Sequence, residues 1–303
     1  MSGRVVVVGS YNVGLTVVGP SLPAPGQTVL GHTFDMGPGG KGSNQAIGAR
    51  RLGAEVTLVA KVGNDVFGAS ARQLFEREGL LGPGIMEADT HTGVGLIMVD
   101  DEGSNMIAVA PGANASLTAE DLDRVPGLFR DASHVLCQLE CPVELFTAAA
   151  RRARQAGATT ILNPAPAVAL PDEAYPLIDI LTPNRSELGV LTGLDPESGG
   201  VEEAARSLVV RGAGEVIVTL GDQGLIRVTS SGAESLPARR VRTRDTTGAG
   251  DAFNAGLAAG LAAGSSMAEA LNLGIRAGAF CVTRLGVIDG LPTLEQLDEE
   301  VPA

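Results

Sequence analysis

Short apolar runs and amphipathic stretches alternate along most of the chain. The first run, at residues 4–8, is almost entirely valine and ends at Gly9, which is typical of a strand buried on both faces of a parallel sheet. Strand–loop–helix units at this spacing imply right-handed crossovers and predict an α/β three-layer sandwich with a mainly parallel central sheet. We expect further strands at 56–60, 134–139, 159–162, 178–181 and 216–220, and helices at 43–52, 68–78, 143–156, 201–211, 252–263 and 267–283.

Two other stretches alternate with the period of a strand. Residues 16–36 contain Pro20, Pro23 and Pro25, which exclude a central helix and favour a loop with one or two short strands. Residues 93–99 and 106–110 flank a polar turn and predict a hairpin. We expect these pieces to form a small β-sheet, a lid built from segments 13–38 and 92–110 of a single domain that spans residues 1–303. The outer face of such a sheet is suited to a homodimer contact.

Composition limits the partners and the compartment. Of the 303 residues, 44% are hydrophobic and 19% are charged, which suits a large soluble domain. A formal net charge of −13 argues against a nucleic-acid partner. Three cysteines are too few for a disulfide framework, and no apolar stretch reaches the ~20 residues that span a bilayer. We therefore expect a cytoplasmic protein with no membrane partner.

One stretch, residues 244–257 (RDTTGAGDAFNAGL), predicts chemistry. A Gly-Ala-Gly turn leads into Asp251, and small and apolar residues then follow at helical spacing. The carboxylate thus lies in the first turn of a helix, whose free N–H groups and dipole attract anions. An acid beside a phosphate-sized nest adds little stability. The pairing suits an acid that takes a proton from an alcohol while the nest holds the phosphoryl group that the alcohol attacks.

A second glycine-rich turn, residues 37–44 (GPGGKGSN), opens a predicted helix. Its Gly37-x-Gly39-x-x-Gly42 spacing matches a dinucleotide fingerprint, but no strong strand precedes it, and GSYNVG after the first strand excludes a Rossmann oxidoreductase. GKG also differs from the GK[ST] of a Walker A loop. A capped helix with an exposed lysine would need fewer glycines. The turn therefore favours backbone brought close to a ligand, with Lys41 and Asn44 at the helix start.

Polar residues recur where predicted strands end or helices begin. Any one of them, Asn184 for example, is equally well explained as a turn former or helix cap. Because the carboxyl ends of parallel strands share one edge, a larger set there indicates a site. The set comprises Asn12, Glu140, Asn184, Glu187, Thr219 and Asp251. The three histidines lack metal or triad spacing and no serine lies in GxSxG, so hydrolase and zinc chemistry have no support.

Two long segments resemble the signatures of the ribokinase-like (PfkB) carbohydrate kinase family. Residues 39–44 (GGKGSN), followed by Gly53 and Gly63, are similar to the first signature, and residues 245–258 (DTTGAGDAFNAGLA) are similar to the second. The similarity runs from residue 5 to about residue 292 and is greatest for ribokinase-type members. It implies a ribokinase-like fold and ATP-dependent phosphorylation of the primary hydroxyl of a pentose, with D-ribose as the first expectation.

The resemblance also implies roles for individual residues. Asp251 matches the general base, and the backbone N–H groups of Gly248, Ala249 and Gly250 match the anion hole. The sugar-binding positions would be Asn12, Gly14, Gly40, Lys41, Asn44, Glu140 and Asp251 itself. The nucleotide-binding positions would be Asn184, Glu187, Thr219, Gly221, Asp222, Gly224, Gly250 and Ile275, with Glu187 near the Mg²⁺–phosphate waters. A monovalent cation, usually K⁺, would have ligands at Asp245, Thr247, Cys281, Arg284, Gly286 and Gly290, several of them through carbonyls.

Three positions depart from the family pattern. Gly14 stands where ribokinases usually carry an Asp that holds two ring hydroxyls, Ile275 where many relatives have Asn or His, and Gly290 where Ser is common. The first departure leaves open a kinase for another pentose, a deoxysugar or a nucleoside. A non-catalytic sugar or nucleotide sensor is a further alternative, although Lys41, Asn44 and Asp251 argue against it because a sensor need not retain the base.

Overall fold

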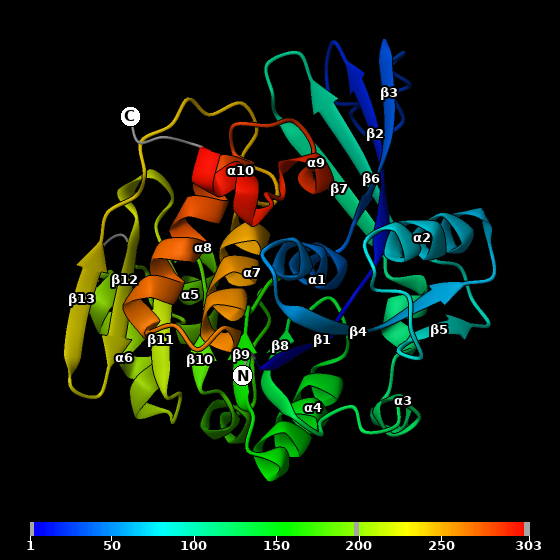
Figure 1. Cartoon of the computed structure of the whole chain (residues 1–303). Coiled ribbons are helices and arrows are strands. Elements are labelled where there is room, and N and C mark those ends of the chain that lie inside the picture. Colours follow the sequence, from blue (N-terminus) through cyan, green and yellow to red (C-terminus); the bar gives the residue numbers. More distant parts are fainter. Residues whose placement is uncertain (1–2, 197–199, 300–303) are drawn as a thin grey trace.

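The chain folds into a three-layer sandwich with a smaller sheet that projects from one end (Figure 1). This computed structural model describes residues 3–196 and 200–299. Within those residues, no helix combines the length and the apolar character needed to cross a membrane.

Among the described residues, the central sheet contains nine strands in the order β13-β12-β11-β10-β9-β8-β1-β4-β5. Every neighbouring pair from β11 to β5 is parallel, and β12 and β13 extend one edge as an antiparallel hairpin. The carboxyl ends of the parallel strands therefore lie along one edge. The strands are β1 (Arg4–Val8), β4 (Glu55–Gly63), β5 (Ile85–Ala88), β8 (Ala132–Cys137), β9 (Thr159–Leu162), β10 (Ile180–Leu181), β11 (Glu215–Thr219), β12 (Leu225–Thr229) and β13 (Gly232–Leu236).

Successive valines of β1 point to opposite faces of the sheet and enter different cores. Val5 and Val7 pack with the helices α1, α2, α7, α8 and α10, whereas Val6 and Val8 pack with α3, α4, α5 and α6. This two-sided burial explains the uninterrupted apolar run. The helices are α1 (Lys41–Arg51), α2 (Val66–Arg77), α3 (Ala119–Asp123), α4 (Val143–Ala156), α5 (Arg185–Thr192), α6 (Val201–Val210), α7 (Ala249–Ala262), α8 (Met267–Cys281), α9 (Val287–Gly290) and α10 (Leu294–Glu299).

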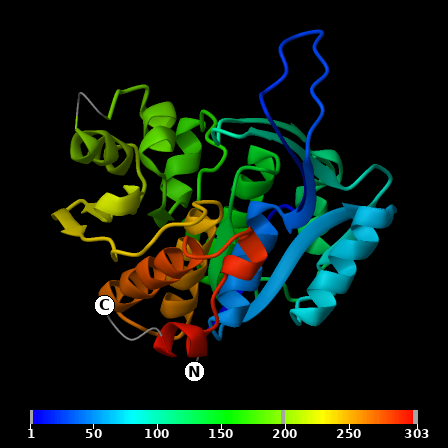
Figure 2. The ribbon, with the colours of Figure 1, turned by 90° about the horizontal axis from the view of Figure 1, so that it is seen from above.

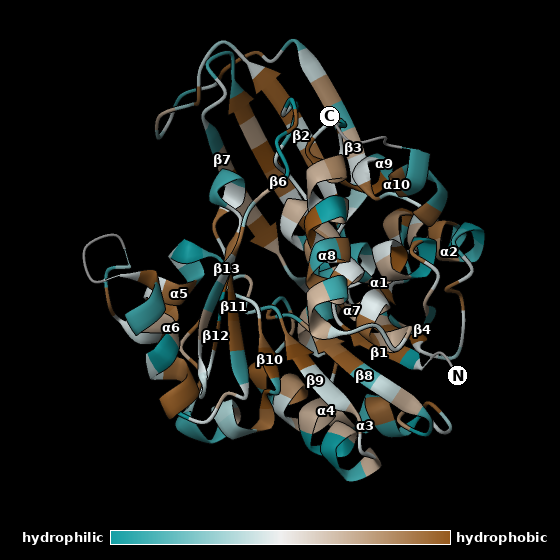
Figure 3. Ribbon diagram, turned by 60° about the vertical axis from the view of Figure 1, so that its left-hand side comes forward, coloured by the Kyte–Doolittle hydropathy of each residue, from teal (hydrophilic) through white to brown (hydrophobic). Residues whose placement is uncertain are grey.

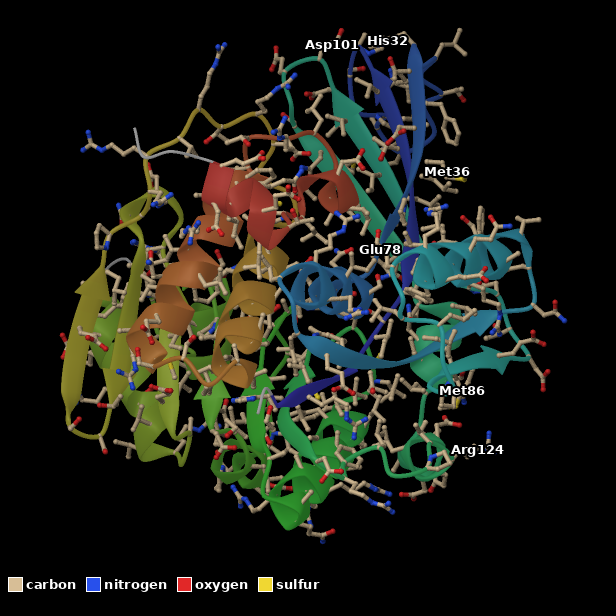
Figure 4. All side chains as sticks on the ribbon, viewed as in Figure 1. His32, Met36, Glu78, Met86, Asp101 and Arg124 are labelled. Carbon is tan, nitrogen blue, oxygen red and sulfur yellow. The ribbon has the colours of Figure 1, made fainter. Side chains whose placement is uncertain are left out.

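The smaller sheet, called the lid sheet below, has the order β3-β2-β6-β7. Its two antiparallel hairpins join through a parallel β2–β6 pair. At the tip, His32 and Asp101 from the two hairpin connections lie 2.8 Å apart (Figure 4). Seen from above, the β2–β3 connection reaches beyond the sandwich (Figure 2). The strands are β2 (Asn12–Gly19), β3 (Thr33–Gly39), β6 (Gly93–Asp100) and β7 (Asn105–Ala110).

The predicted fold class is confirmed, but several elements had not been predicted. The edge strand β5, the β12–β13 hairpin and the short helices α3, α5, α9 and α10 lack a long apolar run or a full helical period. Asn12 and Gly14, expected just beyond the carboxyl end of β1, are the first and third residues of β2. The lid sheet thus begins almost directly at the carboxyl end of β1, which brings it to the edge of the central sheet where the other polar residues gather.

Candidate active site

The first turn of α7 forms the centre of the site. Gly248, the N-cap, has φ 83°, and a Cβ there would lie 2.7 Å from Val287 Cγ1, so conformation and space both require glycine. Ala249 N–H donates to Thr246 O at 3.3 Å. The N–H groups of Gly248, Gly250 and Asp251 have no acceptor within residues 3–196 and 200–299. Three free donors at a helix start make an anion nest. Ala249, expected among these donors, is occupied in the turn, and Asp251 supplies the third N–H.

The Asp251 side chain is 6% exposed, and amide groups hold both of its oxygens. Asn44 Nδ2 donates to Oδ2 at 2.8 Å, and Gln45 Nε2 donates to Oδ1 at 2.9 Å. Both donors lie near the start of α1, as its fourth and fifth residues, and α1 packs against α7 (Figure 1). Asn44 Oδ1 is buried without a partner in the described chain. A bound hydroxyl could donate a hydrogen bond to this unpaired oxygen, which lies beside the buried carboxylate.

The glycine turn before α1 is linked to the end of β8. Gly40 has φ 92°, and a Cβ there would lie 2.7 Å from the backbone of Tyr11 and Asn12. Lys41 N–H donates to Glu140 Oε2 at 2.7 Å, and the Ser10 hydroxyl donates to the same oxygen. Glu140 Oε1 accepts no hydrogen bond from the described residues. The glycines therefore allow backbone packing that brings Lys41 and Glu140 together.

Asn12 is held at the base of the lid sheet. Its Oδ1 accepts from Asn114 Nδ2 at 2.8 Å, and Asn114 also exchanges hydrogen bonds with the backbone of Tyr11. Gly14 lies two residues along β2 on the same face. A Cβ at Gly14 would meet Ile97 Cδ1 at 3.6 Å and Gly37 O at 3.7 Å, which are ordinary contacts. Position 14 therefore has room for a side chain that the sequence does not supply.

The residues expected to bind nucleotide lie around the ends of β10 and β11. Asn184 and Thr219 form an isolated parallel bridge. Gly221 (φ 62°) and Gly224 (φ 90°) flank Asp222 in a tight turn, and a Cβ at Gly224 would lie 2.0 Å from Leu236 O. Ile275 lies on α8, partly buried against the apolar core. The strand ends and the α7 nest thus share one edge of the fold.

Asn184 and Glu187 have a structural role as well. Asn184 Oδ1 accepts from Glu187 N–H and Glu187 Oε2 accepts from Asn184 N–H, both at 2.8 Å, so the pair caps α5. Burial raises the pKa of Glu187, and the Asp251 carboxylate adds to that effect, while the hydrogen bond from Asn184 N–H and the Lys41 ammonium oppose it. Groups from α1, α5 and α7 therefore influence one another electrostatically.

The loop before α7 and the end of α8 form a second cluster, the candidate cation loop. Asp245 accepts from Thr247 N–H at 2.9 Å and from Gly286 N–H at 3.2 Å. Burial opposes ionisation of Asp245, but these hydrogen bonds prevail and its pKa lies below the usual value. Cys281 Sγ lies 3.6 Å from Thr247 O, and Arg284 and Gly290 are bonded through their backbones to Cys281 and Gly286.

The candidate cation loop would have to bind a cation chiefly through carbonyl oxygens. Among the described residues, no group of three or more His, Cys, Asp or Glu side chains could hold a metal ion. Carbonyl oxygens with one carboxylate are the hard ligands that a monovalent or alkaline-earth cation takes, so the donor set fits such an ion and does not fit zinc.

Several residues of the site were missed by sequence reasoning. Gln45, Gln138 and Asn163 form buried hydrogen bonds behind Asp251, and Ser10 and Asn114 orient Glu140 and Asn12. A signal existed for two of them, because Gln138 and Asn163 each come directly after the end of a buried strand. Gln45 lies within the helix, where a buried glutamine has no distinct sequence pattern.

Comparisons with known proteins agree with this geometry. The model of the pfkB family carbohydrate kinases matches residues 2–294. A ribokinase of Haemophilus influenzae is 34% identical, over 98% of this chain and 97% of its own length, and a deoxyribokinase of Salmonella typhi is also 34% identical, over 97% of each. The structure of Arabidopsis thaliana ribokinase complexed with ribose and ATP superposes with a TM-score of 0.90 at 30% identity, covering 99% of this chain and 98% of that one.

A carboxylate beside an anion nest on a ribokinase fold defines an ATP-dependent sugar kinase. The chain belongs to the PfkB family of carbohydrate kinases.

Proposed function

We propose that the protein transfers the γ-phosphoryl group of ATP to the primary hydroxyl of a pentose, D-ribose first among them, with Asp251 as the general base. The observation that carries this proposal is the buried Asp251 carboxylate beside three free N–H donors of α7. The pentose hydroxyl would lie within hydrogen-bond reach of Asp251, with the orphaned Asn44 Oδ1, the free Glu140 oxygen and Asn12 as partners for the other hydroxyls.

In this mechanism Asp251 accepts the hydroxyl proton as the sugar oxygen bonds to the γ-phosphorus. The bond between that phosphorus and the β–γ bridging oxygen breaks, and ADP leaves with its electron pair. The N–H groups of Gly248, Gly250 and Asp251 hold the charge of the transferring group, the main requirement of a loose transition state. ATP with Mg²⁺ supplies the phosphoryl group and its charge neutralisation when bound. Gly221, Gly224 and Asn184 would hold the nucleotide, and Glu187 would orient Mg²⁺-bound water.

We assign the candidate cation loop to a monovalent cation, K⁺ first. The carbonyl-rich donor set and the ionised Asp245 favour this role. An ion there would brace the turn from Asp245 to Gly248 and hence the nest. K⁺ should then raise kcat more than Na⁺, whereas an equal response to both ions would argue against a selective site.

Gly14 favours a second candidate, phosphorylation of 2-deoxyribose or another sugar that lacks one hydroxyl. A site without a bidentate acceptor at position 14 loses its main means of rejecting such a sugar. The deoxyribokinase relative is as similar to this chain as the ribokinase relative, so identity does not separate the two.

One experiment tests both candidates. ATP consumption is measured over ribose, 2-deoxyribose, a hexose and a nucleoside, with K⁺ and Na⁺ in parallel. Turnover of ribose supports the first proposal, and a deoxyribose preference supports the second. No turnover on any substrate would revive the sensor alternative.

The lid sheet is proposed as the contact of a cytoplasmic homodimer. Phe34, Met36, Leu96 and Met106 are each more than half exposed, and cross-strand pairing places them on one face. Figure 3 shows that much of the lid sheet is coloured as hydrophobic. Such an apolar stripe marks a protein contact. Phe34→Asp should give a monomer in light scattering, whereas Leu30→Asp, outside the strands, should leave the dimer. A wild-type monomer would refute the contact.

A further inference from the structure

Behind Asp251 lies a chain of four buried amide side chains. Gln45, fully buried on α1, donates from Nε2 to Asp251 Oδ1 at 2.9 Å and to Asn163 Oδ1 at 3.0 Å. Its Oε1 accepts from Gln138 Nε2 at 2.5 Å. Gln45 thus uses both of its N–H groups and its carbonyl oxygen. Asn44 completes the set on the other carboxylate oxygen.

The direction of these hydrogen bonds is fixed by a backbone group. Asn163 Nδ2 donates to Thr182 O at 3.0 Å, and a backbone carbonyl can only accept. Asn163 Oδ1 therefore faces Gln45 as an acceptor, so Gln45 must present its NH₂ group. The second N–H of that group then points at Asp251. The orientation of the Gln45 amide follows from the main chain just after β10 and does not depend on an arbitrary choice between nitrogen and oxygen.

The same chain returns to the anion nest. Thr182 Oγ1 donates to Asn254 Oδ1 at 2.6 Å, and Asn254 Nδ2 donates to Gly250 O at 2.8 Å. Asn254 and Gly250 belong to the first turns of α7, as Asp251 does. The hydrogen bonds thus form a closed path from the base, through Gln45 and Asn163, to the backbone of the nest. The side chains on this path (Gln45, Asn163, Thr182 and Asn254) all have hydrogen-bond partners, and a satisfied buried path of this kind specifies one geometry. The two free amide oxygens of the set, Asn44 Oδ1 and Gln138 Oε1, lie outside the path.

Resting on the proposed function above, we infer that Gln45 is a positioning residue for the reaction. Its amide holds Asp251 Oδ1 and so aims the remaining lone pairs of the carboxylate at the sugar hydroxyl, in register with the nest. Gln45 does not touch the sugar in this assignment. Asn44, Glu140 and Asn12 retain that role, so loss of Gln45 affects turnover more than sugar binding.

The test compares Gln45→Leu with Gln138→Leu, a matched loss of a neighbouring buried amide that does not contact Asp251. Gln45→Leu should lower kcat by about 10²-fold, the scale for a misplaced catalytic group, with KM for sugar within about threefold. Gln138→Leu should lower kcat by less than about tenfold. In an Asp251→Ala background, Gln45→Leu should change kcat by less than about threefold, because the group it positions is gone.

Three results would each overturn the inference. The first is an equal fall in kcat in Gln45→Leu and Gln138→Leu, and the second is a rise in KM of Gln45→Leu with kcat unchanged. The third is a full additional fall in kcat when Gln45→Leu is added to Asp251→Ala. If the wild-type protein turns over no sugar, the proposed function fails, and crystal structures of the wild type and Gln45→Leu still decide the positioning role. The Asp251 carboxylate should rotate away from its wild-type position in the variant. An unmoved carboxylate would refute the inference.

Discussion

Gly290 lies against Cys281 so closely that a Cβ at position 290 would be 3.0 Å from Sγ and 3.2 Å from the Cys281 carbonyl oxygen. Both residues belong to the candidate cation loop. The family resemblance led us to expect a serine at position 290, and the Cys281 thiol lies against the space that a Cβ there would need. The effect of a substitution at position 290 should therefore depend on the residue at position 281.

Gly290→Ala should destabilise the protein by about 1–3 kcal/mol, the usual cost of overpacking a close-packed contact. In the double variant, Cys281→Ala should restore part of the lost stability because it removes the sulfur that the new Cβ contacts. The recovery should be incomplete because the contact with the Cys281 carbonyl oxygen remains. Thermal melts of the single and double variants measure the coupling. Gly82→Ala, where a Cβ meets nothing within 4 Å, is the control. Additive effects of the two substitutions would show that the thiol is not the obstacle.

Asp251→Asn should lower kcat by about 10²-fold or more, the usual scale for loss of a general base. The hydrogen bonds predict a second effect. Both Asp251 oxygens accept from amide N–H groups, so the NH₂ group that this substitution introduces would face another donor. Rotation of the Asn44 amide relieves the conflict because its free Oδ1 can then accept. That rotation removes an acceptor from the sugar site.

The Asp251→Asn variant should therefore raise KM for sugar as well, whereas Asp251→Ala should raise it less. Steady-state kinetics over a range of sugar concentrations distinguish the two variants, and circular dichroism checks the fold. Near-wild-type turnover of Asp251→Asn would contradict the assignment of the base.

The sequence predicted correctly those segments whose residues favour a single local structure. The valine run of β1 predicted a strand buried on both faces, and the Gly-Ala-Gly-Asp turn predicted a carboxylate at a helix start. The role of a residue that can serve both structure and ligand binding could not be decided from the sequence. Asn184 caps α5 and also lies at the expected nucleotide edge, so its identity does not separate the roles. The contact of Gln45 with Asp251 joins residues that are 206 positions apart, and no local pattern encodes such a contact.

Gly14→Asp should shift preference toward ribose. The position is on an extended strand and has only ordinary contacts for a Cβ, so an Asp fits without strain. A carboxylate there would accept hydrogen bonds from ring hydroxyls, and 2-deoxyribose lacks one of these hydroxyls. We expect the ratio of kcat/KM for ribose over 2-deoxyribose to rise about tenfold or more, since unpaired buried polar groups are costly. Gly14→Leu, similar in size but without acceptors, is the matched control. An equal ratio in both variants would show that position 14 does not read the sugar.

Glu187→Gln should stabilise the protein at neutral pH and lower its activity. The folded-state pKa of Glu187 is raised, chiefly by burial, so the stability that its neutral form provides is present at low pH and is lost as the pH rises through that pKa. The variant keeps a neutral acceptor for Asn184 N–H and avoids burying a charge. Its melting temperature should therefore exceed that of the wild type near pH 7, and the difference should shrink toward pH 4. Glu269→Gln alters the cap of α8 at an exposed position where the pKa is lowered, so it should give the opposite sign. A constant difference across this range, measured by calorimetry without nucleotide or Mg²⁺, would show that ionisation of Glu187 does not set the effect.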